Sequence, residues 1–584
     1  MKIGEKLREE SREKFNKACF PSSNMKSIIC KLLSNKLKID ENKINNLIEI
    51  PPKEELGDYA FPCFSLAKEQ KKSPLIIAQD LCEDFRKKLP EEITNVTNTG
   101  AYLNFFINKK IIAQKMLEET KKTSWGKHNV DSKKIGIEYP APNTNKPLHV
   151  GHLRNISIGN CVMNILKNSG NKVYHLNLFN DRGILISKSM LAYQKFGNGS
   201  TPEKENMSGD KFVGKYYVMF GKEIEKHPEM EEEAKELLQK WESGDKDTIK
   251  LWKQMNEWAY DGLEKTFDKF GLYKIDKNYY ESELYKKGKE IIEDGLKKKI
   301  FTKKDNAIII NLEKEKLGEK VLLRSDGTSV YITQDLYLAM KKIEDFDLDS
   351  SYYVVGNDQI YHFQVLFSIL NKLGIKKDWK HFSYGMVMLP TGKMKSRDGT
   401  AKSAEDLIEE TKKIAMKNIF ERSEDIDKKE SERRGLIISL AAIKYFLLKV
   451  DINKNIIFNP QEALSFEGNT GPYLLYSYAR ANSIIKKAKV NNELKIVDIN
   501  PQEASLIKKI NSFPEITEKA YEQLSPTVLA NYAYELSQIF NEFYHMCPVV
   551  NSSQDKFRLE LVESFKITLR KTLDLLGIDV LDEM

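Results

Sequence analysis

The stretch Ala141-Pro-Asn-Thr-Asn-Lys-Pro-Leu-His-Val-Gly-His-Leu-Arg154 decides the fold, because it separates an apolar strand pattern from a long helical pattern. Residues 135–139 precede it with a short apolar run, and the helical periodicity extends over 149–168. A second strand pattern follows at 173–179. Strand, helix and strand in this order form a βαβ unit, which predicts a parallel sheet of Rossmann-like type with a ligand site at the carboxyl ends of its strands.

The two histidines of this stretch predict chemistry at the start of the helix. Free backbone N–H groups and the positive end of the helix dipole favour phosphate binding there. His149 and His152 can donate hydrogen bonds to a nucleoside triphosphate, and Gly151 lets the nucleoside approach the backbone closely. Two histidines three residues apart could also bind a metal, but no acidic or cysteine ligand lies nearby in sequence, so no metal site is predicted.

Outward from this stretch, the chain divides into three domains. The sequence pattern predicts an α+β domain over residues 1–125, the α/β domain over 130–455 and an all-helical domain over 456–584. A lysine- and glutamate-rich helical insertion is expected at about 196–265. Further strands of the parallel sheet are expected at 308–310, 350–356 and 382–388.

Composition adds limits on class and location. With 93 Lys and Arg against 85 Asp and Glu, the net charge is only +8 over 584 residues, which is compatible with an RNA partner but does not require one. The six cysteines form no CxxC pair, which favours a reducing compartment. The charged N-terminus is unlike an export signal, and the most apolar segment, 436–448, is too short to cross a bilayer, so a cytoplasmic protein without a membrane partner is predicted.

The PNTNKPLHVGHLRN stretch resembles the signature of class I aminoacyl-tRNA synthetases, and its PNTNKP lead-in resembles the arginine-specific branch. Other stretches of that branch follow in the same order, and the resemblance extends over most of the chain from about residue 45. They are Asn180-Asp-Arg-Gly, Arg324-Ser-Asp-Gly-Thr, Val354-Val-Gly-Asn-Asp-Gln359, Lys393-Met-Lys-Ser-Arg-Asp-Gly and Gly468-Asn-Thr-Gly-Pro-Tyr. The resemblance implies activation of L-arginine by ATP, with Mg²⁺ accompanying the nucleotide, and transfer to tRNA(Arg).

The segment 390–402 resembles the mobile KMSKS loop of that class. Such a loop can neutralise the charge that develops on the pyrophosphate and then open for its release. Ser396 stands where the second lysine is common, so the pyrophosphate ligand could be Lys393, Lys395 or Arg397. By resemblance, the ATP-binding residues are Pro142, Asn143, His149, Gly151, His152, Lys393 and Met394, and the catalytic residues are His149, His152, Lys393 and Lys395.

An arginine pocket needs carboxylates and neutral acceptors to match five planar guanidinium donors. By resemblance, its residues are Glu138, Asn143, His149, Tyr331, Asp335 and Gln359. Asp335 and Tyr331 are expected at the guanidinium, and Glu138, Asn143 and Gln359 near the amino and carboxylate groups. A carboxylate left unpaired by a neutral substrate is costly, so no editing domain is expected.

The helical domain resembles the anticodon-binding domain of the family, and Tyr476 with Arg480 is the expected RNA-facing pair, since unstacked bases pack on such groups. The N-terminal domain resembles the one that contacts the tRNA elbow. The resemblance also implies that tRNA must bind before arginine is activated, and a monomer is expected. Two alternatives stay open: a class I synthetase for another amino acid such as cysteine, and a non-catalytic RNA-binding paralogue.

Overall fold

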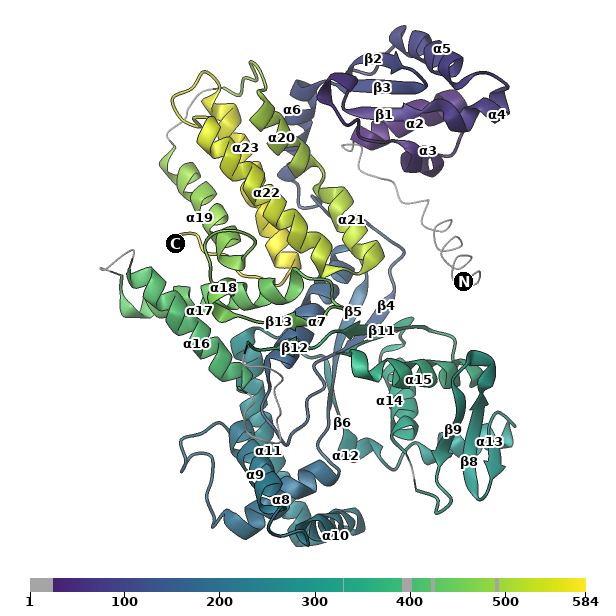
Figure 1. Cartoon of the computed structure of the whole chain (residues 1–584), viewed down its shortest axis with the longest axis vertical. Coiled ribbons are helices and arrows are strands. Elements are labelled where there is room, and N and C mark those ends of the chain that lie inside the picture. The colour runs from purple at the N-terminus through teal and green to yellow at the C-terminus, as the bar shows by residue number, and fades with distance from the viewer. Residues whose placement is uncertain (1–24, 329, 391–401, 422–425, 489–492) are drawn as a thin grey trace.

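The computed structural model describes residues 25–328, 330–390, 402–421, 426–488 and 493–584. The N-terminal domain, the parallel-sheet domain with its insertions and the helical C-terminal domain are distinct in Figure 1. A parallel sheet with covering helices, an α+β N-terminal domain and a helical C-terminal domain confirm the predicted fold class.

The N-terminal domain contains a three-stranded antiparallel sheet of order β1-β3-β2. Helices pack on this sheet and share with it an apolar core of the domain's own. Gly57 takes a positive φ of 109°, and a Cβ there would lie 2.9 Å from the carbonyl oxygen of Phe105, so the close approach of this turn to β3 requires glycine. The elements are α2 (Met25–Leu37), α3 (Glu41–Leu47), β1 (Tyr59–Pro62), α4 (Ala67–Gln70), α5 (Pro74–Arg86), β2 (Ile93–Thr99) and β3 (Tyr102–Ile107).

Helix α6 (Lys109–Thr120) leaves this domain and packs on the C-terminal helices. The Thr120 hydroxyl lies 2.9 Å from that of Ser564, and Trp125 donates through Nε1 to Thr568 Oγ1 at 3.1 Å. The apolar side chains of α6 belong to the large central core and not to the N-terminal one. The sequence predicts residues 109–125 as part of the N-terminal domain. In the structure they pack instead against the core that the parallel-sheet domain and the C-terminal helices share.

The central sheet has the order β11-β10-β4-β5-β6, and every pair in it is parallel. Tyr139, just past β4, packs on Gly159 of α7, whereas the preceding Glu138 pairs with Lys342 of α14, so these helices cover opposite faces of the sheet. The elements are β4 (Lys134–Glu138), α7 (Val150–Asn168), β5 (Lys172–Phe179), β6 (Lys277–Tyr280), α14 (Tyr331–Phe346), β10 (Ser350–Gly356), α15 (Ile360–Lys372) and β11 (Asp378–Tyr384).

Two insertions interrupt the sheet. Between β5 and β6 lies the predicted helical insertion, with its own apolar core. Its helices are α8 (Ile184–Phe196), α9 (Gly209–Glu223), α10 (Met230–Ser243) and α11 (Lys246–Phe270). Between β6 and β10, α12 (Glu281–Leu284) and α13 (Lys289–Lys297) precede an antiparallel sheet of β7 (Thr302–Lys304), β8 (Ala307–Leu312) and β9 (Gly318–Leu323).

Two strand predictions were wrong in detail. Residues 308–310 lie in β8 of the antiparallel sheet, where one face covers a local core, and not in the parallel sheet. Residues 382–388 contain the end of β11 and then β12 (Val387–Met388), which pairs with β13 (Ile456–Ile457) in a separate two-stranded sheet.

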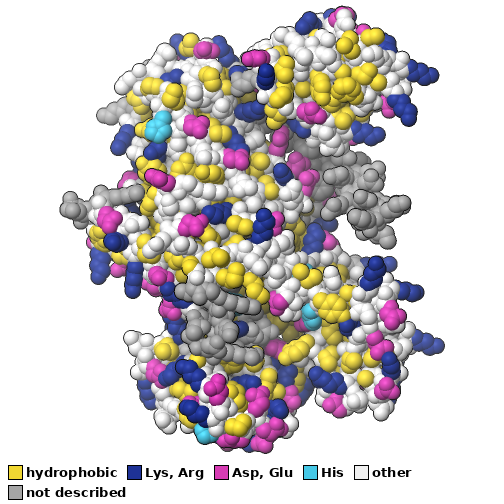
Figure 2. Space-filling model, in the orientation of Figure 1, with side chains coloured by type: hydrophobic (Ala, Val, Ile, Leu, Met, Phe, Trp, Pro, Cys, Tyr) yellow, Lys and Arg dark blue, Asp and Glu magenta, His cyan; other side chains and the backbone are white. Residues whose placement is uncertain are grey.

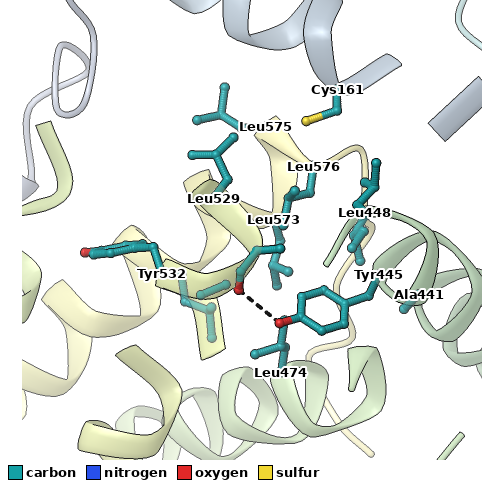
Figure 3. Packing of buried hydrophobic residues seen from close by; sticks show 14 of the residues in the cluster. Cys161, Ala441, Tyr445, Leu448, Leu474, Leu529, Tyr532, Leu573, Leu575 and Leu576 are labelled. Carbon is teal, nitrogen blue, oxygen red and sulfur yellow. Dashed lines mark hydrogen bonds between the residues drawn. The ribbon is translucent and has the colours of Figure 1, made fainter. Parts of the chain in front are cut away.

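The C-terminal helices pack against α7 and α17 (Lys428–Leu448) around the largest core. Figure 3 shows Cys161 of α7 in the same buried cluster as Leu575 and Leu576, and Tyr445 of α17 donates to the carbonyl of Ala530 at 2.9 Å. The remaining helices are α16 (Ala404–Phe420), α18 (Pro460–Ala463), α19 (Gly471–Lys487), α20 (Pro501–Asn511), α21 (Phe513–Gln523), α22 (Pro526–Met546) and α23 (Asp555–Leu575).

The described surface carries charges of both signs. Figure 2 shows Lys and Arg interspersed with Asp and Glu over the visible face. In the described part of the chain, no helix combines the length and apolar character needed to cross a bilayer.

Candidate active site

The junction between β4 and α7 is held to the end of β5 by backbone and amide hydrogen bonds. Asn143 forms a parallel bridge with Asn180, whose backbone N–H donates to Pro142 O at 3.0 Å. Ala141, with a positive φ of 51°, donates its N–H to Asn177 Oδ1 at 3.1 Å. Pro142 and Asn143 therefore form a fixed lead-in at the carboxyl edge of the sheet, as expected for a ligand site of this fold.

Both signature histidines cap the helix that carries them. His149 is the N-cap of α7, and its Nδ1 accepts the backbone N–H of Gly151 at 3.1 Å. His152 Nδ1 in turn accepts the backbone N–H of His149 at 3.1 Å, and the two rings lie 4.0 Å apart. The imidazoles thus satisfy two of the N–H groups that a helix start leaves without partners.

These bonds fix the tautomer of both rings. Because each Nδ1 accepts an N–H, its lone pair is in use, and the ring proton of a neutral imidazole must lie on Nε2. Burial, with the nearby charge of Lys146, lowers the pKa of His149 to about 4. Burial, with His149 and Lys146, holds the pKa of His152 well below its usual value. Near neutral pH the site therefore offers two uncharged Nε2–H donors.

Gly151 has a structural reason beyond the one we predicted. A Cβ at this position would lie 2.9 Å from Cε1 and 3.0 Å from Nδ1 of His149. Any other residue would push the His149 ring off its cap. The glycine therefore keeps the imidazole in place, whatever it also does for an approaching nucleoside.

Glu138, at the end of β4, forms a buried ion pair with Lys342 of α14. Lys342 is fully buried, and its ammonium lies 4.4 Å from the ring centre of Tyr353. Burial alone would lower the pKa of Lys342, but the charge of Glu138, the Tyr353 phenol and the bond to Glu138 outweigh it, so the pKa is raised. One Glu138 oxygen is therefore already paired with a cation.

Asp335 lies one helical turn after Tyr331 on α14, and its carboxylate meets His362 Nε2 of α15 at 2.6 Å. Asp335 also acts electrostatically on Lys342 and Tyr353, which places it beside the Glu138 pair. The Tyr331 side chain is 75% exposed. Gln359 is exposed as well, and its Nε2 donates to Asp358 at 2.9 Å.

The histidine helix and the β10 end of the sheet are joined directly. Asn155 of α7 donates through Nδ2 to Val354 O at 2.6 Å, two residues before β10 ends at Gly356. β10 runs parallel to β4, with Tyr353 opposite Glu138. One edge of the sheet therefore carries the signature histidines, Glu138 and the segment that leads to Gln359. Asp335 is joined to α15 through His362.

Three of the predicted residues, Lys393, Met394 and Lys395, lie outside the described residues, and so does Arg397. Within the described ranges, no group of three or more His, Cys, Asp and Glu side chains is placed to hold a metal ion.

Arg480 and Tyr476 of α19 do lie together. The Arg480 guanidinium donates to the Tyr476 hydroxyl at 2.8 Å and to Asn541 Oδ1 at 2.7 Å. It also lies 4.6 Å from the Tyr476 ring centre and 5.2 Å from that of Tyr544 on α22. Both rings are partly exposed, so the three side chains form an ordered, exposed cluster of planar groups of the kind on which unstacked bases pack.

Comparisons with known proteins cover most of the chain. Residues 112–460 match the family model "tRNA synthetases class I (R), catalytic domain", 23–107 match "Arginyl tRNA synthetase N terminal domain", and 474–584 match "DALR anticodon binding domain". The chain is 43% identical to an arginine–tRNA ligase of Treponema denticola, over 94% of this chain and 96% of the relative.

The chain belongs to the arginyl-tRNA synthetase family. It is 44% identical to an arginine–tRNA ligase of Flavobacterium psychrophilum over 83% of each chain. Its fold is similar to that of the Thermus thermophilus arginyl-tRNA synthetase, with a TM-score of 0.81, 26% identity and coverage of 96% of this chain and 100% of that one. The molecule is thus an aminoacyl-tRNA synthetase, and the expected family resemblance is confirmed.

Sequence reasoning missed Glu281, the first residue of α12, which directly follows the carboxyl end of β6 at the same edge of the parallel sheet. Burial raises the pKa of Glu281 to about 7; Arg182 opposes this rise, and Asp181 and Asp335 add to it. A carboxyl that interacts with Asp335 and is short of cationic partners suits a cationic ligand. No local pattern indicates this role, because Glu281 lies outside every recognised stretch, in a lysine- and glutamate-rich region.

Arg154, the last residue of the stretch 141–154, has a structural role that the sequence alone does not predict. It is fully buried and donates to the carbonyl oxygens of Gly385, Lys454 and Asp451 at 2.7, 2.8 and 3.2 Å. Burial lowers its pKa to about 10, so the guanidinium stays charged at neutral pH. It ties α7 to the segment between β11 and β12 and to the segment that precedes β13.

Proposed function

We propose that this chain activates L-arginine with ATP and transfers it to the 3′ end of tRNA(Arg), at the carboxyl edge of its parallel sheet. The observation that carries the proposal is the pair of neutral Nε2–H donors at the start of α7, on the same edge as the carboxylates of Glu138, Asp335 and Glu281. We call these three carboxylates the acidic wall. Phosphate donors beside an acidic wall suit a nucleotide and a cationic amino acid held together.

In the first step, an oxygen of the arginine carboxylate bonds to the α-phosphorus of ATP. The bond from this phosphorus to the bridging oxygen breaks, and pyrophosphate leaves with its electron pair. Negative charge develops on the phosphoryl oxygens, and His149 and His152 donate Nε2–H bonds to them without giving up a proton. Mg²⁺ enters as the partner of ATP, and Lys393, Lys395 or Arg397 pairs with the leaving pyrophosphate.

In the second step, a terminal hydroxyl of tRNA attacks the carbonyl carbon of arginyl-adenylate, and AMP leaves. Tyr476 and Arg480 bind an unstacked base of the tRNA at a distance from this chemistry. The N-terminal domain contacts another part of the tRNA, and tRNA must be present before arginine is activated.

Selection of arginine rests on the acidic wall. The guanidinium offers planar paired donors to Asp335 and Glu281, with Tyr331 closing over it, while Glu138, Asn143 and Gln359 lie nearer the amino and carboxylate groups. Lysine offers a single ammonium in place of the fork. A neutral amino acid leaves Glu281 without a cationic ligand, which costs about 1–3 kcal/mol or more.

The test is aminoacylation of tRNA(Arg) by the purified chain with Mg²⁺-ATP and a panel of arginine, lysine and cysteine. Only arginine should be charged. Charging of cysteine would support the alternative synthetase, and tRNA binding without any charging would support the non-catalytic paralogue. Pyrophosphate exchange with arginine should require tRNA, and exchange at full rate without tRNA would refute that requirement.

We further propose that the chain works as a monomer in the cytoplasm. All described cysteines are free and buried, as suits a reducing compartment. Light scattering at working concentration should give a mass near 67.5 kDa. A dimer mass would overturn the monomer.

A further inference from the structure

Asp181, two residues past the end of β5, is a buried carboxylate that joins three segments of the chain. It is only 1% exposed. It belongs to the Asn180-Asp-Arg-Gly stretch, which the sequence marks without giving it a task. Its side chain bonds both α12 and α11, and its carbonyl oxygen bonds α11 as well.

The first contacts are with α12. Asp181 Oδ1 accepts the backbone N–H of Ser282 at 2.8 Å, and Oδ2 accepts the Ser282 hydroxyl at 2.7 Å. The N–H of Ser282 belongs to the peptide bond that joins it to Glu281. Asp181 therefore fixes the backbone plane from which the Glu281 side chain starts.

The second contacts are with α11 of the helical insertion. Asp181 Oδ2 accepts the Tyr260 hydroxyl at 3.0 Å. Its carbonyl oxygen accepts Trp252 Nε1 at 2.7 Å and Asn256 Nδ2 at 3.2 Å. One residue at the sheet edge thus holds both α12 and the longest helix of the insertion.

The neighbouring Arg182 contacts the residue that follows α12 and two residues of α10. Its guanidinium lies 4.0 Å from the ring centre of Tyr285 and 5.5 Å from that of Trp241, and it pairs with Glu242. α12 is only four residues long, so it is too short to hold its own position and depends on these contacts.

We propose that Asp181 is a positioning residue for arginine selection, which holds Glu281 at the place in the acidic wall where the guanidinium binds. The proposal rests on the proposed function, because it assumes that arginine is the ligand. Asp181 does not touch the substrate in this scheme. It acts by fixing the Glu281 backbone and by adding negative charge beside the Glu281 carboxyl.

The charges that face Glu281 agree with this role. They are Arg182, which favours its ionised form, and Asp181 and Asp335, which disfavour it. Burial raises the pKa of Asp181 itself, while the bonds from Ser282 and Tyr260 oppose that rise. A carboxylate held by several donors keeps its geometry when a ligand enters or leaves.

The test compares Asp181→Ala, Asp181→Asn and Ser282→Ala in the full chain, with Asp210→Ala as a matched control. Asp210 is another buried carboxylate of the same insertion, bonded to Ser208 on its own side of α9. The readouts are the KM for arginine, the KM for ATP, kcat with saturating tRNA(Arg), and the melting temperature.

Asp181→Ala should raise the KM for arginine about 10- to 100-fold, since several bonds to a charged group are lost, and leave the KM for ATP within about twofold. Asp181→Asn keeps an oxygen for the Ser282 N–H and should stay within about fivefold of the parent chain. It should also move the pH midpoint of the arginine KM downward, because one negative charge facing Glu281 is gone. A merely structural residue would not move that midpoint.

Asp210→Ala should leave the KM for arginine unchanged. An unchanged arginine KM in Asp181→Ala would overturn the proposal, and so would equal rises in the KM for arginine and ATP. If Asp181→Ala does not fold, Ser282→Ala carries the test with an expected rise of about three- to tenfold, and no rise would refute the role. Failure of the parent chain to charge arginine would instead refute the proposed function.

Discussion

At the scale of single residues, His149 and His152 serve their own helix before they serve a ligand. Each Nδ1 accepts a backbone N–H of the first turn, and this bond leaves Nε2–H as the only donor that the neutral ring can offer. Helix capping and ligand binding thus use opposite sides of the same ring. Substitution should therefore affect both the start of the helix and the chemistry, by different amounts.

His152→Ala should lower kcat about 100- to 1000-fold, the range seen when one preorganised transition-state donor is removed. The lost cap should cost only about 1 kcal/mol of stability. Binding of tRNA, measured directly by a filter or fluorescence assay, should be unchanged. His227→Ala, which removes an exposed histidine paired with Glu229, is the control and should turn over like the parent chain. A normal kcat for His152→Ala would contradict the catalytic role.

If Glu281 binds the guanidinium as we propose, we expect arginine binding to depend on pH. The carboxyl pairs with the guanidinium only when ionised, and burial raises its pKa to about 7. The KM for arginine should therefore increase as pH falls through 7, by about tenfold between pH 8 and pH 6. With saturating arginine, kcat should change little, since the histidines stay neutral. Glu281→Gln should raise the KM for arginine at every pH and remove its pH dependence. If the KM of the variant changes with pH as that of the parent chain does, Glu281 is not the group that causes the dependence.

The residues that could be predicted are those in a contiguous stretch. The helix start at residues 149–152 could be predicted, but not that its two imidazoles accept backbone N–H groups of the first turn. Glu281 could not be found in this way. Its environment is made by Asp181, Arg182 and Asp335, which reach it only through the sheet topology, and an isolated glutamate in a lysine-rich segment carries no local sign of burial.

At the scale of elements, the contact between β4 and α14 depends on a buried ion pair. Lys342 is fully buried and Glu138 is 6% exposed, so loss of either partner leaves the other charge without compensation. The next residue, Lys341, pairs with Asp345 and Glu344 at the surface. Two adjacent lysines on one helix thus offer a direct comparison.

Lys342→Met should lower the free energy of unfolding by about 3–5 kcal/mol, because a buried carboxylate is left unpaired. Lys341→Met should leave the free energy of unfolding nearly unchanged, because solvent screens an exposed ion pair. Chemical denaturation of both variants checks the difference. Addition of Glu138→Gln to Lys342→Met should recover part of the loss, and equal effects of the two single variants would show that the pair is not buried in solution.

The elements predicted well are those whose pattern has one interpretation. The βαβ unit around α7 has strands buried on both faces and a long helix, so its periodicity was sufficient. The apolar run at 308–310 has two interpretations. A short apolar strand fits a parallel sheet or a small antiparallel sheet on a local core, and only its pairing with β7 and β9 decides between them.

At the scale of the whole molecule, Tyr476 and Arg480 of α19 and Tyr544 of α22 form the surface that we propose binds RNA, in a different domain from the histidines. Arg480→Ala should raise the KM for tRNA about tenfold, because one stacking partner of a base is lost, and leave the KM for ATP unchanged. Arg433→Ala, which removes an exposed arginine paired with Glu430, is the control. Steady-state aminoacylation with varied tRNA concentration gives the KM for tRNA of both variants. If Arg480→Ala and Arg433→Ala have the same KM for tRNA, Arg480 does not contribute to RNA binding.

Helix α7 joins these distant regions without a loop between them. Its first turn carries the histidines, and near its other end Asn164 donates to the carbonyl of Asp574 at 2.8 Å, close to the end of α23. Most of its side chains are buried, so it cannot slide past its neighbours as a separate body. The two signature imidazoles and the contact with α23 therefore lie near opposite ends of one buried helix, and we expect a displacement at one end to be transmitted to the other.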